Sequence, residues 1–206
     1  HAIHFTMGGN GVSVLVIPGD VSMQEVEDDT FTSSAISAGR PIVYPDPAEA
    51  AALTQAINEA KTVALFVGAG VKNAREQVLA LAEKIKAPIG HALGGKMYIQ
   101  YDNPFDVGMS GLLGYGAAHE ATHEADLLIL LGTDFPYNDF LPDANVAQVD
   151  IDGSHIGRRT RIKYPVTGDV AATIENILPH VDEKKDRSFL DTMLKKHYDK
   201  LEHVVE

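Results

Sequence analysis

The sequence predicts an α/β fold: a doubly wound, Rossmann-like parallel sheet of about six strands with helices on both faces. Two observations lead to this prediction. Short, nearly continuous apolar runs recur along the chain, and such runs are typical of parallel strands that are buried on both faces. Between them lie longer segments whose apolar residues recur at helical spacing. This alternation is typical of a sheet whose strands are joined by helices.

The clearest strand candidates are residues 62–67, Thr-Val-Ala-Leu-Phe-Val, and 126–131, Asp-Leu-Leu-Ile-Leu-Leu. The expected strands are residues 62–67, 87–93, 105–109, 126–131, 146–151 and 164–167. Pro47 suits the first turn of a helix, and Asp169 is placed to cap a later one. The expected helices are residues 47–60, 71–86, 115–125, 169–179 and 186–204, with a helical turn near 154–158. One face of the last helix is expected to carry Phe189, Met193, Tyr198 and Leu201.

The ends of the chain do not follow this alternation. Residues 12–17, Val-Ser-Val-Leu-Val-Ile, have the pattern of a buried strand, preceded only by the end of a helix. Acidic residues and three prolines then predict a linker of limited flexibility. Because the chain opens at His1 rather than Met, we expect a piece of a longer protein. The expected division is residues 1–21 as the end of another domain, 22–44 as a linker, 45–182 as the main domain and 183–206 as a connecting helix.

Composition narrows the possible functions. The 17 Lys and Arg residues against 29 Asp and Glu residues give a net charge of −12, which argues against nucleic acid or an anionic membrane as the main partner. The absence of cysteine excludes disulfides, thiolate catalysis and Cys-ligated zinc. The longest apolar run, Leu127–Leu131, is far shorter than the ~20 residues of a membrane helix. With no visible signal peptide, a cytoplasmic location is expected.

Two loops that follow expected strands are candidates for a ligand site. Gly68-Ala69-Gly70 lets the backbone approach a phosphate, or makes a tight turn and nothing more. An ordinary NAD site is disfavoured, because Asn73 replaces the third glycine of the dinucleotide fingerprint. Residues 132–137 offer backbone amides, a hydroxyl and two aromatic rings, which suit a flat heteroaromatic ligand.

Acidic residues at the end of the strand at 146–151 belong to the same edge of the expected sheet. Asp150 and Asp152 are placed to accept hydrogen bonds from a ribose or an adenine. The alternative is that they cap the helical turn that follows.

Residues 119–123, His-Glu-Ala-Thr-His, match the HExxH pattern, in which two imidazoles hold zinc and the glutamate acts as a base. The chain has no cysteine for a third ligand, and an acidic ligand would need a different fold. We therefore expect a polar helix face and no metal site. The basic cluster of Arg158, Arg159, Arg161 and Lys163 is expected to be a solvated or inter-subunit surface.

Taken together, the motifs resemble one family over nearly the whole chain: the thiamine-diphosphate-dependent pyruvate dehydrogenases (quinone), also called pyruvate oxidases, of bacteria. The resemblance is carried by residues 11–20, 86–96, 101–114, 131–137 and 149–152. It implies a homotetramer that decarboxylates pyruvate to acetate and CO₂ on thiamine diphosphate and Mg²⁺. Electrons would pass through FAD to a quinone, with the enzyme peripheral at the inner face of the cell membrane.

The resemblance also assigns the domains and the cofactor contacts. Residues 1–21 would end the aminopyrimidine-binding domain, 45–182 would be the central FAD-binding domain, and 183–206 would lead toward the diphosphate-binding domain. The implied FAD contacts are Ser110, Gly111, Leu112, Leu113, Thr133, Asp134, Phe135, Pro136, Tyr137 and Asp150, with Gly68, Gly70 and Asp152 as further candidates.

No catalytic residue is expected within this chain. The family's Gly-Asp-Gly motif with a later Asn-Asn does not occur, and its activating glutamate would lie upstream of His1. The chain alone is therefore expected not to decarboxylate pyruvate. Gly94 stands where relatives carry Arg, a change expected to weaken or alter flavin binding.

Two alternatives stay open at this point. The first is a structural central domain of a thiamine-diphosphate-dependent decarboxylase or synthase, without a redox-active flavin. The second is an NAD-dependent deacylase, since Gly68–Val71 is similar to the opening motif of that family. The lack of cysteines for a zinc ribbon, and of the Pro-Asp-Phe-Arg continuation, disfavours the deacylase.

Overall fold

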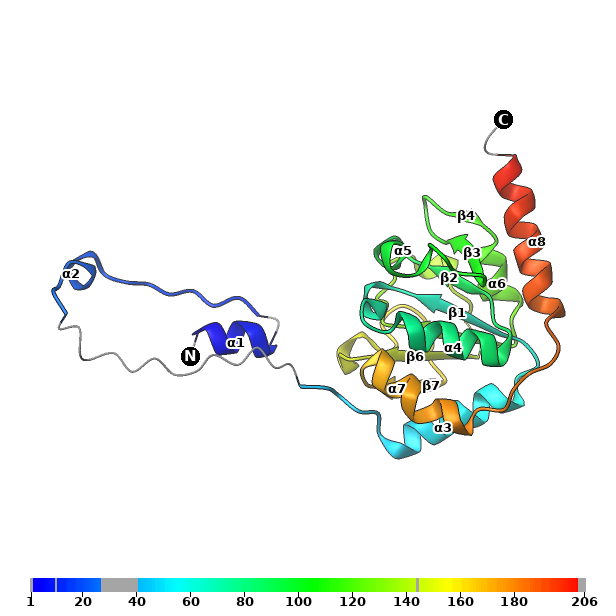
Figure 1. Cartoon of the computed structure of the whole chain (residues 1–206), viewed down its shortest axis with the longest axis horizontal. Helices are drawn as coiled ribbons and strands as arrows, with labels where there is room; N and C mark the ends of the chain where they lie inside the picture. Colours follow the sequence, from blue (N-terminus) through cyan, green and yellow to red (C-terminus); the bar gives the residue numbers. More distant parts are fainter. Residues whose placement is uncertain (1, 10, 27–40, 144, 204–206) are drawn as a thin grey trace. The chain divides into compact units, whose positions relative to one another are not determined.

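The computed structural model describes residues 2–9, 11–26, 41–143 and 145–203 (Figure 1). They belong to two units, His1–Ile42 and Val43–Glu206. Most of the predicted linker, residues 27–40, lies outside the described residues.

The first unit contains helix α1 (Ala2–Gly9), as expected, and a short helix α2 (Gly19–Ser22). The strand prediction for residues 12–17 is wrong, because this stretch has no regular secondary structure and Val12 is 86% exposed. A strand requires a hydrogen-bonding neighbour, and none is assigned among the described residues of this unit. An apolar, β-branched pattern alone does not provide that neighbour.

The second unit is built on one seven-stranded sheet with the order β4-β3-β2-β1-β5-β6-β7. The strands are β1 (Val63–Val67), β2 (Ile89–His91), β3 (Asp106–Met109), β4 (Tyr115–Gly116), β5 (Leu127–Leu131), β6 (Val146–Asp150) and β7 (Tyr164–Thr167). Six of them are parallel and confirm the predicted strands. The two-residue β4, which pairs antiparallel with β3, was not expected.

Helices connect the strands much as expected. They are α3 (Pro47–Glu59), α4 (Arg75–Ile85), α5 (Leu93–Ile99), α6 (Ala118–Glu124), α7 (Val170–Ile177) and α8 (Ser188–Glu202), with 3₁₀ turns η2 (Ala69–Val71), η3 (Asn138–Phe140), η4 (Gly153–His155) and η5 (Leu178–His180). Asp169 caps α7 by accepting a hydrogen bond from the Ala172 amide, as predicted. The helix predicted at 71–86 begins later, after η2, and α5 was missed because its seven residues include two glycines.

Two hydrophobic clusters lie on opposite faces of the sheet, because successive side chains of a strand point to opposite faces. From β1, Leu65 enters the cluster with α3, α4 and α7, and Phe66 enters the other with α6. Figure 1 shows α3, α4 and α7 together on one side of the sheet. Both faces of the sheet are therefore covered, which confirms the predicted fold class.

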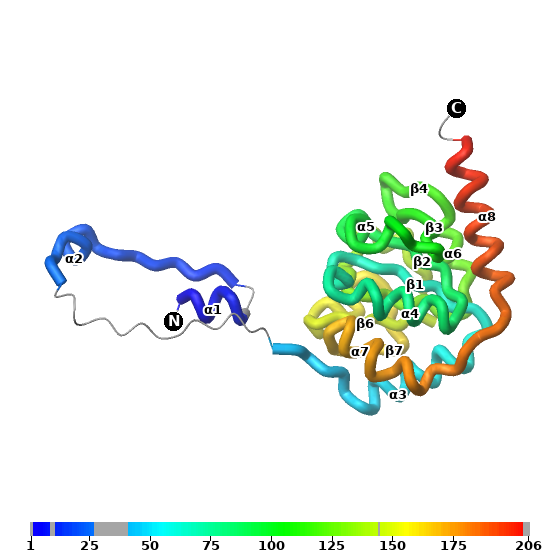
Figure 2. The backbone as a smooth tube through the Cα atoms, viewed as in Figure 1, coloured from blue at the N-terminus to red at the C-terminus, as the bar shows by residue number. Residues whose placement is uncertain are grey.

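Helix α8 differs from its prediction in the face that it buries. The buried side chains are Leu190, Met193 and His197, whereas Tyr198 is 57% exposed. The reason is that α8 lies beside β3 and β4 at the edge of the sheet (Figure 2). Within the second unit, α8 is therefore packed against β3, β4 and α6.

Strands β1 to β4 form one half of the sheet and β5 to β7 form the other. The two halves meet where β1 pairs in parallel with β5. Here the Gly70 amide donates a hydrogen bond of 2.9 Å to the Gly132 carbonyl. A Cβ atom on Gly70 would lie 2.6 Å from the Gly132 Cα atom, so the two backbones touch. The turns that follow β1 and β5 are held together by this contact.

None of the described helices is both long and apolar enough to cross a membrane.

The contact between Gly70 and Gly132 predicts a stability effect. Gly70→Ala forces a methyl group against the opposing backbone and should lower the free energy of unfolding by about 2–3 kcal/mol. Gly94→Ala is the matched control, because its Cβ would meet nothing closer than 3.6 Å. Urea unfolding of both variants measures the difference, and equal stabilities would contradict this packing.

Candidate functional site

The carboxyl ends of the parallel strands form one edge of the sheet, where open α/β sheets bind ligands. The structure brings all the predicted site residues to this edge. Gly68 and Gly70 follow β1, residues 110–113 follow β3, residues 133–137 follow β5, and Asp150 ends β6. These residues therefore lie along one edge of the sheet.

Two cavities at this edge are lined in part by the loop 132–137. The first, about 210 Å³, is lined by Leu93 and Gly94 and by parts of the loops 109–113 and 135–137. The second, about 280 Å³, is lined on its polar side by Asp134, Asp150, His155 and Asp169. Both cavities have mainly apolar linings, and they differ in that three carboxylates line the second.

The apolar cavity owes its shape to aromatic packing. Phe135 is buried, and its ring makes edge-to-face contacts with two other aromatic rings. The distances between ring centroids are 5.0 Å to Phe66 and 5.4 Å to Tyr137. Leu112 and Leu113, in contrast, are 73% and 74% exposed. Phe135 is therefore part of the core beneath the site, and the two leucines form its open rim.

Ser110 contributes a buried polar atom to the apolar cavity. Its hydroxyl oxygen has no hydrogen-bond partner among the described residues, and the residue lines the cavity that also touches Leu93. An unpaired buried hydroxyl is costly unless a ligand or water satisfies it. Ser110 is therefore the predicted contact with the clearest unused hydrogen-bonding capacity.

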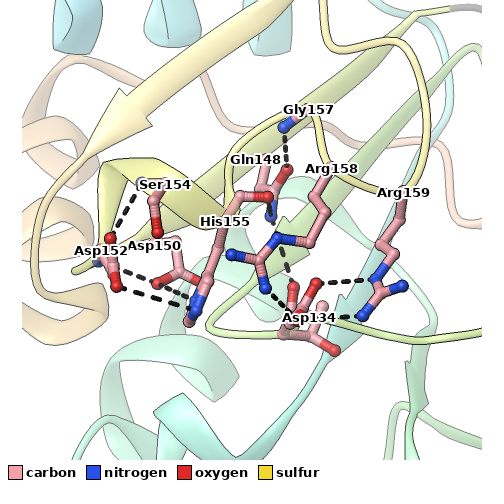
Figure 3. Close-up of polar contacts among 10 residues, drawn as sticks. Asp134, Gln148, Asp150, Asp152, Ser154, His155, Gly157, Arg158 and Arg159 are labelled. Atoms are coloured by element: carbon pink, nitrogen blue, oxygen red, sulfur yellow. Dashed lines mark hydrogen bonds and ion pairs between the residues drawn. The ribbon is translucent and has the colours of Figure 1, made fainter.

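Gln148, in the middle of β6, holds the loops of this edge together (Figure 3). Its amide nitrogen donates to the carbonyl oxygens of Thr133 and His155, at 3.4 and 3.3 Å, and its oxygen accepts from the Gly157 amide at 3.0 Å. The side chain is fully enclosed, so these bonds replace those to water. Sequence reasoning missed it, although a glutamine inside an apolar strand was a signal of a buried polar role.

Asp134 is bound by two arginines of the predicted basic cluster (Figure 3). Arg158 donates from Nη1 at 3.0 Å and Arg159 from Nε at 2.8 Å. The hydrogen bond from Arg159, together with the charges of both arginines, lowers the pKa of Asp134. These two arginines therefore fasten their loop to 132–137, a contact that the expectation of a solvated or inter-subunit surface did not include, and the Arg158 side chain stays exposed.

The two acids after β6 are also engaged within the domain. Asp150 Oδ1 accepts from the Asp152 amide at 3.0 Å and lies 3.3 Å from His155 Nδ1. Asp152 caps η4 by accepting from the Ser154 amide at 2.9 Å, and this bond lowers its pKa. The capping alternative therefore accounts for Asp152.

The glycine turn after β1 does not present its amides to a ligand. The Gly68 amide donates to the Leu131 carbonyl at 3.0 Å, and the Gly70 amide donates to Gly132. A Cβ on Gly68 would lie 2.5 Å from the Gly132 oxygen. The tight-turn alternative accounts for both glycines, because their close packing against the β5 turn uses the amides that a phosphate would need.

The HExxH residues, 119–123, all lie within α6. The ring centroids of His119 and His123 are 4.2 Å apart. Glu120 binds Lys200 of α8 instead of facing the two imidazoles. In the part of the chain that is described, no group of three His, Asp or Glu side chains is suited to hold a metal ion.

A family model described as "Thiamine pyrophosphate enzyme, central domain" matches residues 50–177. An uncharacterized 42.6 kDa protein of Pseudomonas amyloderamosa is 44% identical over 200 residues, which cover 97% of this chain and 50% of that protein. YdaP of Bacillus subtilis, named as a thiamine pyrophosphate-containing protein, is 35% identical over 196 residues, covering 92% of this chain and 33% of YdaP. The chain thus spans half of the first relative and a third of the second.

Relatives with named activities are more distant. An acetolactate synthase of Mycobacterium leprae is 32% identical, with 86% of this chain and 30% of that protein covered. Pyruvate oxidase of Lactiplantibacillus plantarum is 26% identical, with 89% and 31% covered. The crystal structure of benzoylformate decarboxylase from Polynucleobacter necessarius matches with a TM-score of 0.63 at 19% identity, covering 80% of this chain and 32% of that one. At that identity the match concerns the fold.

The role of Gln148 predicts a further stability effect. Gln148→Leu removes the bonds to both loops and leaves the Gly157 amide unpaired, which should cost about 1–3 kcal/mol. Gln77→Leu is the control, because Gln77 bonds only at the surface, to Glu175. Equilibrium unfolding compares the two variants, and a Gln148→Leu protein as stable as the control would refute the role of this side chain.

Proposed function

The chain belongs to the family of thiamine pyrophosphate enzyme central domains, and we propose that it is the structural central domain of a decarboxylase or synthase that uses thiamine diphosphate to act on a 2-oxo acid. Pyruvate, in the name of one relative, is a 2-oxo acid. One observation supports this structural role. Polar groups at the carboxyl edge form hydrogen bonds and ion pairs with other groups of the same domain.

Several of the polar groups that a nucleotide would bind have an internal partner, whereas the Ser110 hydroxyl has none among the described residues. The Gly68 and Gly70 amides bond to β5 and its turn, Asp134 binds two arginines, and Asp152 caps η4. A cofactor would have to displace these bonds before forming its own, with little net gain. The edge is better suited to holding the domain together than to receiving a dinucleotide.

Thiamine diphosphate, when bound in such an enzyme, stabilises the carbanion that decarboxylation leaves behind. The residues of this chain hold the sheet and its loops in place. Both Gly-Asp pairs, at 19–20 and 168–169, are followed by valine, and Asp169 serves as a helix cap. No step of the decarboxylation is therefore assigned to these residues.

A second candidate is the FAD-binding central domain of a pyruvate dehydrogenase (quinone). It is favoured by the unpaired Ser110 hydroxyl and by the two cavities that the loop 132–137 lines in part, the second of which is also lined by three carboxylates. A flat ring in the first cavity and an adenosine near Asp150 in the second would suit their chemistry. A homotetramer and electron transfer to a membrane quinone belong to this candidate.

Flavin binding distinguishes the two candidates. The structural role predicts a colourless purified chain that leaves the absorbance and fluorescence of added FAD unchanged at micromolar concentrations. Saturable binding, weakened by Ser110→Val and unaffected by Ser188→Val at the exposed start of α8, would overturn the structural role in favour of the FAD site.

Turnover by the chain alone is a separate prediction. Supplied with pyruvate, thiamine diphosphate, Mg²⁺ and FAD, the 206-residue chain should form neither acetate nor CO₂ above the rate of a sample without protein. Sustained product formation that follows the protein concentration would contradict the assignment of catalytic residues to parts outside this chain.

A further inference from the structure

Two histidines and an aspartate form a buried cluster beside the apolar cavity, where the His91 carbonyl accepts a hydrogen bond from the Ser110 amide. His91 Nε2, at the end of β2, lies 3.6 Å from one carboxylate oxygen of Asp106 in β3. His197 Nε2, on α8, lies 4.0 Å from the other oxygen. All three residues are less than 9% exposed. No group of three His, Asp or Glu side chains in the described part of the chain, this one included, is suited to hold a metal ion. The proposed function gives these three residues no role.

The imidazole of His197 enters the sheet edge through a gap between two glycines. A Cβ on Gly116 would lie 2.2 Å from His197 Nδ1, and one on Gly108 would lie 3.2 Å away. Both glycines have positive φ angles, +76° and +94°, which other residues rarely adopt. Strands β3 and β4 therefore lack side chains at the place where α8 inserts its histidine.

The surroundings of His197 contain few groups able to neutralise a positive charge. From β4, the Tyr115 ring lies 6.4 Å away, and burial raises the pKa of Tyr115 to about 12, so it stays neutral. From α5, Lys96 lies over the Tyr115 ring and adds a positive charge. The acids of α6, Glu120 and Glu124, bind Lys200 and Lys196 of α8.

On α8 itself, Tyr198 places its ring 5.3 Å from the imidazole of His197. The Nδ1 atom of His197 is buried without a well-aligned hydrogen-bond partner among the described residues, and a contact with the Val107 backbone raises the pKa of His197 by less than burial lowers it. Asp106 is therefore the acidic group in position to balance a proton on His197.

We propose that His91, Asp106 and His197 form a proton-controlled latch, which holds α8 on the sheet edge near neutral pH and releases it when His197 becomes protonated. Neutral imidazole fits the glycine gap, whereas imidazolium is costly there because the gap excludes water. Together with Glu120 of α6, Lys200 and His203 line a cavity of about 670 Å³, so release of α8 would remove one of its walls.

The direction of the pH effect follows from the pKa shifts. Burial lowers the pKa of His91 to about 4 and also lowers the pKa of His197. The stability that the neutral imidazoles contribute is therefore fully present above about pH 6.5 and is lost as the pH falls below that value. Burial raises the pKa of Asp106 to about 6, which acts in the opposite direction. Protonation of Asp106 near pH 6 removes the negative charge that could balance a proton on His197, so a proton on His197 favours the released helix.

Hydrogen exchange of the full chain tests the latch. Between about pH 7.5 and about pH 5, after correction for intrinsic exchange, the amides of α8 should lose about tenfold or more of their protection relative to those of β1. In His197→Gln, α8 should keep the same relative protection at both pH values. His203→Gln, on the exposed end of the same helix, should behave as the wild type.

If α8 of the His197→Gln variant does not pack on the sheet at any pH, a second measurement tests the proposal on the wild type. The imidazole of His197 in the wild type, followed by NMR, should titrate below the ordinary value of about 6.5, together with the loss of α8 protection. Protection of α8 that is independent of pH relative to β1, or a His197 that titrates at or above 6.5 while α8 stays protected, would overturn the proposal.

Discussion

Gly70 and Gly132 meet backbone to backbone at the point where the chain passes from one half of the sheet to the other. A crevice at such a crossover is where open α/β sheets usually accept a ligand. Here the hydrogen bond between the two glycines fills the centre of the crossover, and two cavities lie at the same edge of the sheet. The arrangement of the whole carboxyl edge depends on the absence of side chains at these two positions.

The loops around this contact are fixed by buried or paired polar groups. Gln148 reaches both the turn after β5 and the loop after β6, and Asp134 joins the same two loops through Arg158 and Arg159. A buried polar group also fixes the packing at β3 and β4, at one end of the strand order. There His197 fits between two glycines and faces Asp106. In both places a polar side chain, rather than an apolar one, determines how a peripheral segment packs.

The fold was predictable from the sequence because each parallel strand is a short apolar run with both faces buried, and that pattern is local. The misplaced elements depend on contacts that are not local. Residues 12–17 have a strand pattern without a described partner, and α8 buries His197 because β3 and β4 happen to offer a glycine gap. The position of the site was likewise predictable, because strand ends mark the edge of the sheet. The partners of Asp134 were not, since Arg158 and Arg159 come from a different loop.

Hydrogen exchange of the loop 132–137 and of the turn at 153–157, with and without FAD, tests the central claim most directly. If the carboxyl edge is complete by itself, the amides that donate within the domain, those of Gly132, Ser154, His155 and Gly157, are protected without any cofactor, and added FAD leaves the exchange of both loops unchanged. Loops that exchange freely until FAD is added, and then become protected, would contradict the claim and identify the edge as a cofactor site.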